Sequence, residues 1–305
     1  MPSFSTGMKV LDDLLGGGIP CGVITTIYGD ADSGKTTLTM IVAAQAIKQN
    51  RSLFLCYTED MFSEERFKQI TDAAGIDFAE MRSSLFNYKT ATSMGDQVKA
   101  VKGWVQEAEM FNKMGKKPGL FIIDSISRHY HDALSKVPAE HLAGTARMLI
   151  GKIVAQTEVL GQLAIEYGCP ALAITWTKSG AGQRFSRQER QDMMQSGELY
   201  DLELGLGSKT YDFVGGRNLE YTSKVIIHAL PFRGSERIAL LEKHPYMPTE
   251  RLVRLKLTAV GFEAVDGEVH ELDEFWQMKI DEAEAERRRK KQGGQGKPRD
   301  QLAAS

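Results

Sequence analysis

The chain has 305 residues, of which 42% are hydrophobic and 26% charged, a composition that is typical of a globular protein. Its formal net charge of -2 excludes a global positive field, so any contact with nucleic acid needs a local basic patch. The three cysteines, Cys21, Cys56 and Cys169, are too scattered for a disulfide framework or a tetrahedral zinc site, which indicates reduced thiols.

The first residues contain neither the basic segment nor the apolar segment of a secretory signal peptide. No uninterrupted apolar run approaches the roughly 20 residues that a helix needs to span a bilayer. We therefore expect a soluble, cytoplasmic protein without a membrane partner.

The first half of the chain alternates short apolar runs with segments of helical periodicity. A first helix at residues 8–15 is expected to end at the glycine run 16–18. Strands are then expected at residues 23–28, 53–57, 84–88, 120–123 and 171–175, and helices at residues 35–50, 63–74, 95–111 and 138–167. Ser63 is the expected N-cap of the helix that it begins. Short strands separated by helices predict a mostly parallel sheet that is covered on both faces.

The pattern changes after residue 177. Residues 178–216 are polar and lack sustained periodicity, which is typical of a functional loop or a disordered segment. Strands with short connections are expected at residues 223–230, 237–241 and 252–257, as an antiparallel extension of the sheet. These patterns predict one α/β core at residues 1–275. Acidic, basic and then glycine-rich runs predict a charged, partly disordered tail at residues 276–305.

The loop after the first apolar strand has the spacing G-x-x-x-x-G-K-S/T of a phosphate-binding loop. It is formed by Gly29, Asp30, Ala31, Asp32, Ser33, Gly34, Lys35 and Thr36, and Thr37 follows as a further candidate for nucleotide contact. Glycines let backbone N–H groups point inward, and the N-terminus of the next helix adds a positive dipole end. Lys35 would reach the β- and γ-phosphates, and the Thr36 hydroxyl would bind Mg²⁺. The sequence therefore predicts a site for a nucleoside triphosphate with Mg²⁺.

Two residues of this loop, Asp30 and Asp32, are carboxylates in a segment that must hold a polyanion. Like charges repel each other, so inward-pointing carboxylates would weaken nucleotide binding. We therefore expect both side chains to point away from the phosphates.

Hydrolysis of a bound triphosphate needs an acid that orients the metal and a group that positions the attacking water. Asp124 ends the strand expected at residues 120–123 and is placed like a metal-orienting acid, although acids there also cap helices and turns. Glu59 follows the strand at residues 53–57 and is a candidate general base, although acids after strands are also common on surfaces. Glu59 and Lys35 are the predicted catalytic residues.

Several segments of the chain resemble the core domain of RecA/RadA recombinases. The lead-in at residues 5–20, the segment at residues 58–66, and Asp124 with Ser125 are similar to the corresponding segments of that family. The run from FVGG at residues 213–216 to SKVII at residues 223–227 most resembles the archaeal RadB branch. The resemblance covers roughly residues 3–265. It implies a RecA-like P-loop ATPase core that uses ATP and Mg²⁺.

The resemblance also implies roles for single residues. Lys35 and Thr36 would bind phosphate and Mg²⁺, and Asp124 would hold the water shell of the metal. Glu59 would polarise the attacking water. Arg66 would lie against the adenine ring.

In filaments of this family two loops line the DNA axis, and the resemblance places them near residues 128–136 and 178–215. The candidate DNA contacts are basic residues of these segments: Arg128, Lys178, Arg184, Arg187 and Arg190. The second half of the longer segment is acidic, so phosphate contact is expected only from its first half. A solvated loop that touches no DNA is the alternative.

The chain departs from the family pattern in two places. RadA-type recombinases carry an N-terminal helical domain used for polymerisation, whereas this chain starts at the ATPase core, as RadB does, which puts long filaments in doubt. After the strand at residues 171–175 the family usually has Asn-Gln, and this chain has Trp176 and Thr177. The family's glutamine senses the γ-phosphate, so an altered or lost coupling between ATP and DNA is expected.

These features favour a RadB-like recombinase paralogue that binds ATP, hydrolyses it slowly and assists homologous recombination and DNA repair. The expected partners are ATP, single-stranded or branched DNA, a recombinase or polymerase subunit, and further copies of the chain. Two other interpretations stay open: a KaiC-like signalling ATPase without a DNA role, and an ATP-gated adaptor for a recombinase.

Overall fold

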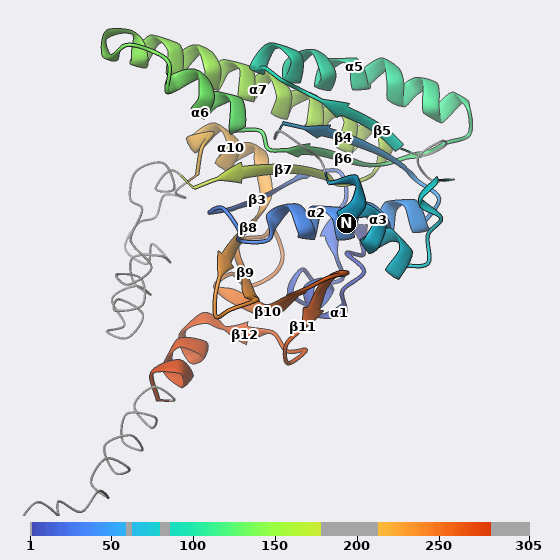
Figure 1. Cartoon of the computed structure of the whole chain (residues 1–305). Coiled ribbons are helices and arrows are strands. Elements are labelled where there is room, and N and C mark those ends of the chain that lie inside the picture. Colours follow the sequence, from blue (N-terminus) through green and yellow to red (C-terminus); the bar gives the residue numbers. More distant parts are fainter. Residues whose placement is uncertain (1, 59–62, 80–85, 178–212, 282–305) are drawn as a thin grey trace, which may run out of the picture. The chain divides into compact units, whose positions relative to one another are not determined.

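The computed structural model describes residues 2–58, 63–79, 86–177 and 213–281. Of these, residues 2–177 and 213–269 belong to one compact unit, which holds most of the labelled elements of Figure 1. Residues 270–281 belong to a second unit and contain β12 (His270–Glu271) and a helical segment. Most of the tail expected at residues 276–305 lies outside the described residues.

The first unit is built on a mixed sheet with the strand order β11-β10-β9-β8-β3-β7-β6-β4-β5. The strands are β3 (Ile24–Gly29), β4 (Ser52–Tyr57), β5 (Phe86–Thr90), β6 (Pro118–Asp124), β7 (Ala171–Trp176), β8 (Ser223–Pro231), β9 (Glu236–Lys243), β10 (Arg251–Thr258) and β11 (Gly261–Ala264). All pairs from β8 to β5 are parallel, and the pairs β8–β9, β9–β10 and β10–β11 are antiparallel. The predicted parallel sheet with an antiparallel extension is therefore confirmed.

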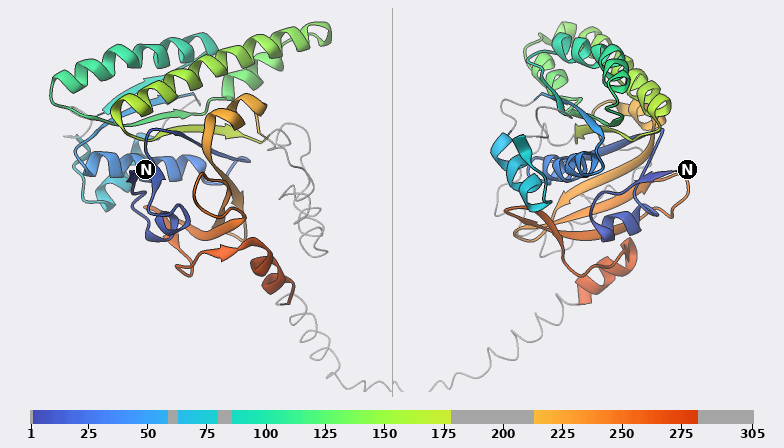
Figure 2. Two further views of the ribbon diagram at one scale, coloured as in Figure 1. Left: turned by 180° about the vertical axis from the view of Figure 1, so that it is seen from behind. Right: turned by 90° about the vertical axis from the view of Figure 1, so that its right-hand side faces the viewer.

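Helices cover both faces of the parallel part (Figure 2). One face carries α2 (Lys35–Lys48) and α3 (Glu64–Ala73), and the other carries α5 (Met94–Lys113), α6 (Arg128–Leu134) and α7 (Leu142–Tyr167). Successive side chains of a strand point to opposite faces, so each strand serves two hydrophobic cores. In β4, Leu53 and Leu55 join the core under α2, whereas Phe54 and Cys56 join the core under α5 and α7.

Local capping residues set the starts of two helices. The Ser63 hydroxyl accepts a hydrogen bond from the Arg66 N–H at 3.1 Å, which confirms Ser63 as the N-cap of α3. The Ser93 hydroxyl accepts from the Asp96 N–H at 3.1 Å and starts α5 at Met94, one residue before the expected helix. The expected helix at residues 8–15 is present as α1 (Lys9–Leu14).

The structure contains short elements that the sequence patterns do not predict. α6 and α10 (Gly216–Thr222) have seven residues each, fewer than the periodicity of a helix needs to become visible. β1 (Ser3–Phe4) and β2 (Ile19–Pro20) pair on either side of α1 and are shorter still. The helix expected at residues 138–167 is divided into a 3₁₀ turn, η1 (Ala139–His141), and α7.

The helical stretch Ala139–Tyr167 is long and apolar enough, by length and composition alone, to cross a membrane, with a mean hydropathy of 1.3 in an 18-residue window. Charged residues such as Arg147 and Lys152 interrupt this stretch, so it is not the uninterrupted apolar run that the sequence was expected to lack. Along α7, the side chains of Leu149, Ile153, Leu160 and Leu163 are buried in the core that the helix shares with the sheet. Packing against the sheet therefore accounts for the apolar residues on this face of the helix, whereas Met148 and Ile165 are exposed.

Candidate functional site

The predicted phosphate loop connects β3 to α2 at the carboxyl edge of the parallel strands. Gly29 leaves no room for a side chain, because a Cβ there would lie 2.1 Å from the carbonyl oxygen of Ala229 on β8. Gly34 has a φ of +89°, and a Cβ there would lie 2.5 Å from the ring of Phe262 on β11. The path of the loop, held close to β8 and β11, therefore requires both glycines.

Lys35 places its ammonium group within the loop itself. The side chain is buried, and Nζ donates to the carbonyl oxygens of Gly29 at 2.9 Å and Asp30 at 2.6 Å and to the Ser33 hydroxyl at 3.2 Å. A phosphate that enters the loop would compete with these oxygens for the same positive charge. The geometry thus brings a cation to the place where the loop pattern predicts one.

The two carboxylates of the loop have different surroundings. Asp32 is exposed, in agreement with the expected outward direction, and has a φ of +61°. Asp30 is half-buried, and its Oδ1 accepts a hydrogen bond from the Thr177 hydroxyl. The carboxylate of Asp30 is therefore directed toward the end of β7 by a specific donor.

A small pocket beside the loop brings together the two predicted metal-binding side chains, Thr36 and Asp124. Asp124 ends β6 and is only 2% exposed. The remaining lining residues are Thr39, Met40, Ala43, Leu55, Tyr57 and Phe67. Hydroxyl and carboxylate oxygens are ligands that Mg²⁺ prefers, so Thr36 and Asp124 fit that ion, whereas most of the other lining residues are apolar.

The ends of β4 and β6 are joined by a pair of hydrogen bonds. The Thr58 hydroxyl donates to the Ser125 carbonyl oxygen at 2.8 Å and accepts from the Ser125 N–H at 2.8 Å. Thr58 directly follows β4 and Ser125 directly follows Asp124. The predicted general base, Glu59, is the next residue after Thr58 and lies outside the described residues.

Arg66, the residue that the resemblance places against adenine, connects α3 with the turn between β10 and β11. Its Nη2 donates to the Thr258 carbonyl oxygen at 2.5 Å, and its Nη1 donates to the Ala259 carbonyl oxygen. These bonds fix the guanidinium at the turn that leads to Phe262. A contact with adenine stays a prediction.

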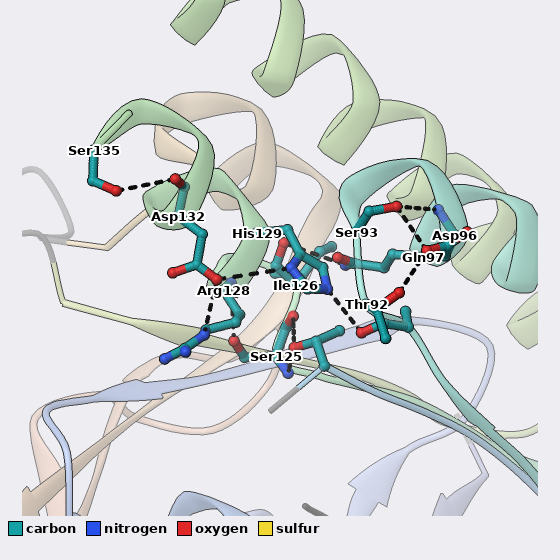
Figure 3. A network of polar contacts seen from close by, with 12 residues as sticks. Thr92, Ser93, Asp96, Gln97, Ser125, Ile126, Arg128, His129, Asp132 and Ser135 are labelled. Atoms are coloured by element: carbon teal, nitrogen blue, oxygen red, sulfur yellow. Dashed lines mark hydrogen bonds and ion pairs between the residues drawn. The ribbon is translucent and has the colours of Figure 1, made fainter. Parts of the chain in front are cut away.

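Arg128, the candidate DNA contact that the structure describes, is the first residue of α6 and belongs to a network of polar contacts (Figure 3). Its side-chain Nε donates to Asp132 Oδ2 at 3.1 Å, and its backbone N–H donates to the Ser125 hydroxyl at 3.2 Å. Its guanidinium carbon is 5.8 Å from the centre of the Trp176 ring. Arg128 is thus held beside the end of β7.

The neighbouring histidines have structural contacts. His129 is buried, and its Nε2 donates to the Ala91 carbonyl oxygen at 2.9 Å. The His131 ring lies 5.8 Å from the Trp176 ring, and burial lowers the pKa of His131, which favours its neutral form. Within the part of the chain that the structure describes, no group of three or more His, Cys, Asp or Glu side chains is arranged to hold a metal ion.

The other four candidate DNA contacts lie outside the described residues: Lys178, Arg184, Arg187 and Arg190. Both ends of that segment are described. Thr177 pairs with Phe213 in an antiparallel bridge, and the Thr175 hydroxyl donates to the Val214 carbonyl oxygen at 3.0 Å. The segment therefore begins and ends at β7, next to the phosphate loop.

Three contacts of the loop region were not predicted from the sequence. The hydroxyl of Tyr28, the residue before Gly29, donates to the Glu242 carboxylate at 2.7 Å, and the His228 ring stacks on Tyr28 at 4.1 Å. Nε of Arg237, on β9, donates to the carbonyl oxygen of Asp32 at 2.7 Å. None of the three partners is close in sequence to the loop, and no spacing pattern marks these pairs.

Comparison with known proteins gives a consistent result. A protein-family model described as "ATPase: KaiC" matches residues 4–160. The DNA repair and recombination protein RadB of Methanoculleus marisnigri is 31% identical over 262 residues, which cover 86% of this chain and 97% of that protein. RadB of Pyrococcus abyssi is 26% identical over 263 residues, covering 86% of this chain and 94% of that protein.

A solved structure described as the crystal structure of the RadB recombinase matches the fold with a TM-score of 0.61 and 25% sequence identity. The match covers 86% of this chain and 99% of that one. The family model matches just over half of the chain, and the RadB relatives extend the match across most of it. The chain therefore belongs to the RecA-like ATPase family described by the KaiC model, as a RadB-like recombinase paralogue.

Proposed function

We propose that the chain binds ATP together with Mg²⁺ at the phosphate loop and hydrolyses the ATP slowly. The arrangement of Lys35, Thr36 and Asp124 carries this proposal: a buried ammonium group within the loop, and two oxygen-bearing side chains that line one pocket beside it. Membership of an ATPase family supports the same reaction.

Each residue has a distinct part in the proposed reaction. Lys35 would hold the γ-phosphate and offset the negative charge that develops on it. Thr36 and Asp124 would hold Mg²⁺, the first through its hydroxyl and the second through the water shell. Bound Mg²⁺ supplies charge neutralisation at the phosphate oxygens. Glu59 would orient the attacking water, and it follows Thr58, whose hydrogen bonds hold the end of β4 beside the end of β6.

The variant Glu59→Gln tests this mechanism. Loss of a general base is expected to lower ATP turnover by about a hundredfold or more, while the affinity for ATP stays within a few-fold of the parent. Phosphate release at saturating Mg·ATP measures the turnover, and Glu65→Gln, an exposed acid on α3, is the matched control. If Glu59→Gln turned over ATP as fast as the parent chain, Glu59 would not be the general base.

We further propose that the chain contacts single-stranded or branched DNA and assists homologous recombination and DNA repair. The relatives that match most of its length are described as DNA repair and recombination proteins, which supports this role. Arg128 supports it as well, because α6 presents this cation beside Trp176 at the edge where the 178–212 segment begins. Arginine and aromatic side chains together are typical of contacts with single-stranded nucleic acid.

Binding of a labelled single-stranded oligonucleotide across a salt series tests the DNA role, with and without ATP. The logarithm of the affinity is expected to fall with the logarithm of the salt concentration, and Arg128→Gln is expected to reduce that slope by about 1. Arg147→Gln, an exposed residue on α7, serves as the control and should leave the slope unchanged. A slope near zero for the parent chain would remove the DNA role.

A second candidate function, a signalling ATPase without a DNA role, is supported by the KaiC description of the model that matches residues 4–160. Sizing the protein with ATP, in the presence and absence of single-stranded DNA, separates the two functions. A shift to larger species that needs DNA favours the recombination role and a homo-oligomer on DNA. An ATP-dependent shift to larger species that is the same with and without DNA favours the signalling ATPase. Binding to a recombinase without measurable turnover would favour an ATP-gated adaptor.

A further inference from the structure

Two side chains contact the phosphate loop from outside, one from each flank of β3. On one flank, β7 pairs with β3 in a parallel register that sets Trp176 opposite Gly29. The next residue, Thr177, therefore lies beside the second residue of the loop. On the other flank, β8 pairs with β3 and β9 follows beyond it, with Arg237 near the start of β9.

The contact from β7 acts on the side chain of Asp30. Thr177 is only 6% exposed, and its hydroxyl donates to Asp30 Oδ1. The bridge between Thr177 and Phe213 fixes the backbone of the donor. A carboxylate that accepts a hydrogen bond from a fixed, buried hydroxyl is held in one direction, here toward the end of β7.

The contact from β9 acts on the backbone of Asp32. Arg237 Nε donates to the Asp32 carbonyl oxygen at 2.7 Å, and its Nη1 donates to the carbonyl oxygens of Gly234 at 3.0 Å and Glu236 at 2.8 Å. The Glu236 carboxylate does not compete for this guanidinium, because Arg254 Nη2 binds it at 2.7 Å. The guanidinium thus bridges the β8–β9 hairpin and the loop.

The backbone of Asp32 needs such support. Its φ of +61° is in the left-handed region, which is unfavourable for a residue with a side chain. This conformation is located two residues before Gly34, where the N–H groups of the loop lead into α2. A charge-assisted hydrogen bond to the Asp32 carbonyl offsets that cost and also brings a positive charge next to a loop that carries two carboxylates.

We propose that Arg237 and Thr177 are positioning residues of the ATP site. Arg237 holds the loop backbone in the conformation that receives the phosphates, and Thr177 holds the Asp30 carboxylate away from them. The proposal rests on the phosphate loop being the ATP site, as proposed above. It adds two residues from outside the loop pattern, and it explains how a loop with two acidic residues accepts a polyanion.

The experiment measures the equilibrium affinity for a fluorescent ATP analogue and for ADP in the parent chain and in single variants. Arg237→Gln is expected to weaken both nucleotides by roughly ten- to a hundredfold, as for the loss of a hydrogen bond made by a charged group. Thr177→Val is expected to weaken them by roughly three- to tenfold. Arg233→Gln is the matched control, because Arg233 is exposed on the same hairpin and its guanidinium lies 5.4 Å from the Phe232 ring.

A second measurement separates positioning from a general loss of folding. In the Thr177→Val variant the Asp30 carboxylate no longer accepts a hydrogen bond from residue 177. Adding Asp30→Asn to this variant removes the negative charge of that carboxylate and is expected to restore nucleotide affinity to within a few-fold of the parent. A purely structural defect would not be restored by this change. Thermal unfolding without nucleotide is expected to show one cooperative transition for the parent, Arg237→Gln and Arg233→Gln, with Arg237→Gln still folded at the temperature of the binding measurement.

Each outcome decides the proposal. Weaker nucleotide binding in Arg237→Gln and Thr177→Val, with rescue by Asp30→Asn and with an unaffected Arg233→Gln, supports it. Parent-like affinities in both variants would overturn the positioning role and leave the ATP site itself standing. A parent chain that binds neither nucleotide would overturn the proposed ATP site, and the positioning role with it.

Discussion

The parallel and the antiparallel parts of the sheet contribute to the candidate site in different ways. Parallel strands bring their carboxyl ends to one edge, and there β3 leads into the loop with Lys35 and Thr36 while β6 ends on Asp124. The antiparallel part supplies supports: Arg237 on β9 bonds the loop backbone, and Phe262 on β11 packs against the last glycine of the loop. The groups proposed to bind ATP and Mg²⁺ thus come from the parallel part, and the antiparallel part helps to hold the loop in place.

The two parts also differ in how their residues recognise the loop. Lys35 and Thr36, at the end of the parallel strand β3, belong to a local sequence pattern in which neighbours along the chain share one function. Arg237, in contrast, donates a hydrogen bond to the backbone carbonyl oxygen of Asp32, which is 205 residues away in sequence. Any residue type at position 32 offers that oxygen, so the support depends on the fold and not on the side chain that it touches.

The largest effect on this arrangement is expected from Gly29→Ala, at the point where the two parts meet. The added Cβ would lie 2.1 Å from the Ala229 carbonyl oxygen of β8 and 2.8 Å from the Ser33 hydroxyl, so β8 or the loop must shift. The free energy of unfolding is expected to fall by about 1–3 kcal/mol, and nucleotide affinity is expected to fall with it.

Urea unfolding measures the stability of Gly29→Ala against Gly144→Ala. A Cβ at Gly144, in α7, meets no heavy atom within 4 Å, so that control is expected to stabilise the protein by about 0.5–1 kcal/mol. Equal stabilities of the two variants would mean that β8 does not approach the loop as closely as described.

A somewhat smaller effect is expected from Asp124→Asn, which tests the parallel part alone. Loss of the carboxylate that we propose to hold the water shell of the metal is expected to lower activity or Mg²⁺ affinity by about 10–100-fold. A Mg²⁺ titration of ATP turnover measures it, and Asp13→Asn, an exposed acid paired with Lys9 on α1, is the control. A parent-like Mg²⁺ dependence would exclude Asp124 as the metal-orienting acid.

The packing of the parallel strands shields two buried thiols. Burial raises the pKa of Cys56, on β4, and of Cys169, just before β7, from 9.0 to about 12. At pH 8 the folded protein should therefore react with iodoacetamide about a thousandfold more slowly at these thiols than the urea-unfolded protein. Rapid alkylation of either thiol in the folded protein would show that these strands open.

The same pKa shifts predict a dependence of stability on alkaline pH. The thiols keep their protons to higher pH in the folded state than in the unfolded state. Their contribution to stability is therefore complete below about pH 9 and is lost as the pH rises toward about 12. Urea unfolding at pH 8 and at pH 10 measures this loss, and substitution of Cys56 by alanine should reduce it.

Much of the fold was predictable because its signals are local. Apolar runs marked β3, β4, β6 and β7, and the Ser63 hydroxyl marked the start of α3. The loop pattern predicted the place of Lys35, which the structure buries within the loop. Elements of seven residues, such as α6, lack the length for a periodic signal, and α6 is the element that carries Arg128.

The supports of the loop were not predictable in the same way. Asp30 and Thr177 are each unusual in the sequence, but their pairing depends on the register between β3 and β7. With that register known, the sequence would place Thr177 beside Asp30. The contact of Arg237 cannot be inferred in this way, because its acceptor is a backbone oxygen and β8 lies between β9 and β3.

Calorimetric titration of Mg·ATP into the parent chain and into Lys35→Ala tests the central claim most directly. Lys48→Ala, an exposed lysine at the end of the same helix, is the control. The phosphate loop described here predicts one ATP per chain for the parent and the control, and loss of binding for Lys35→Ala with an unchanged circular dichroism spectrum. Equal binding of ATP by Lys35→Ala and the parent chain would contradict the assignment of the ATP site to this loop.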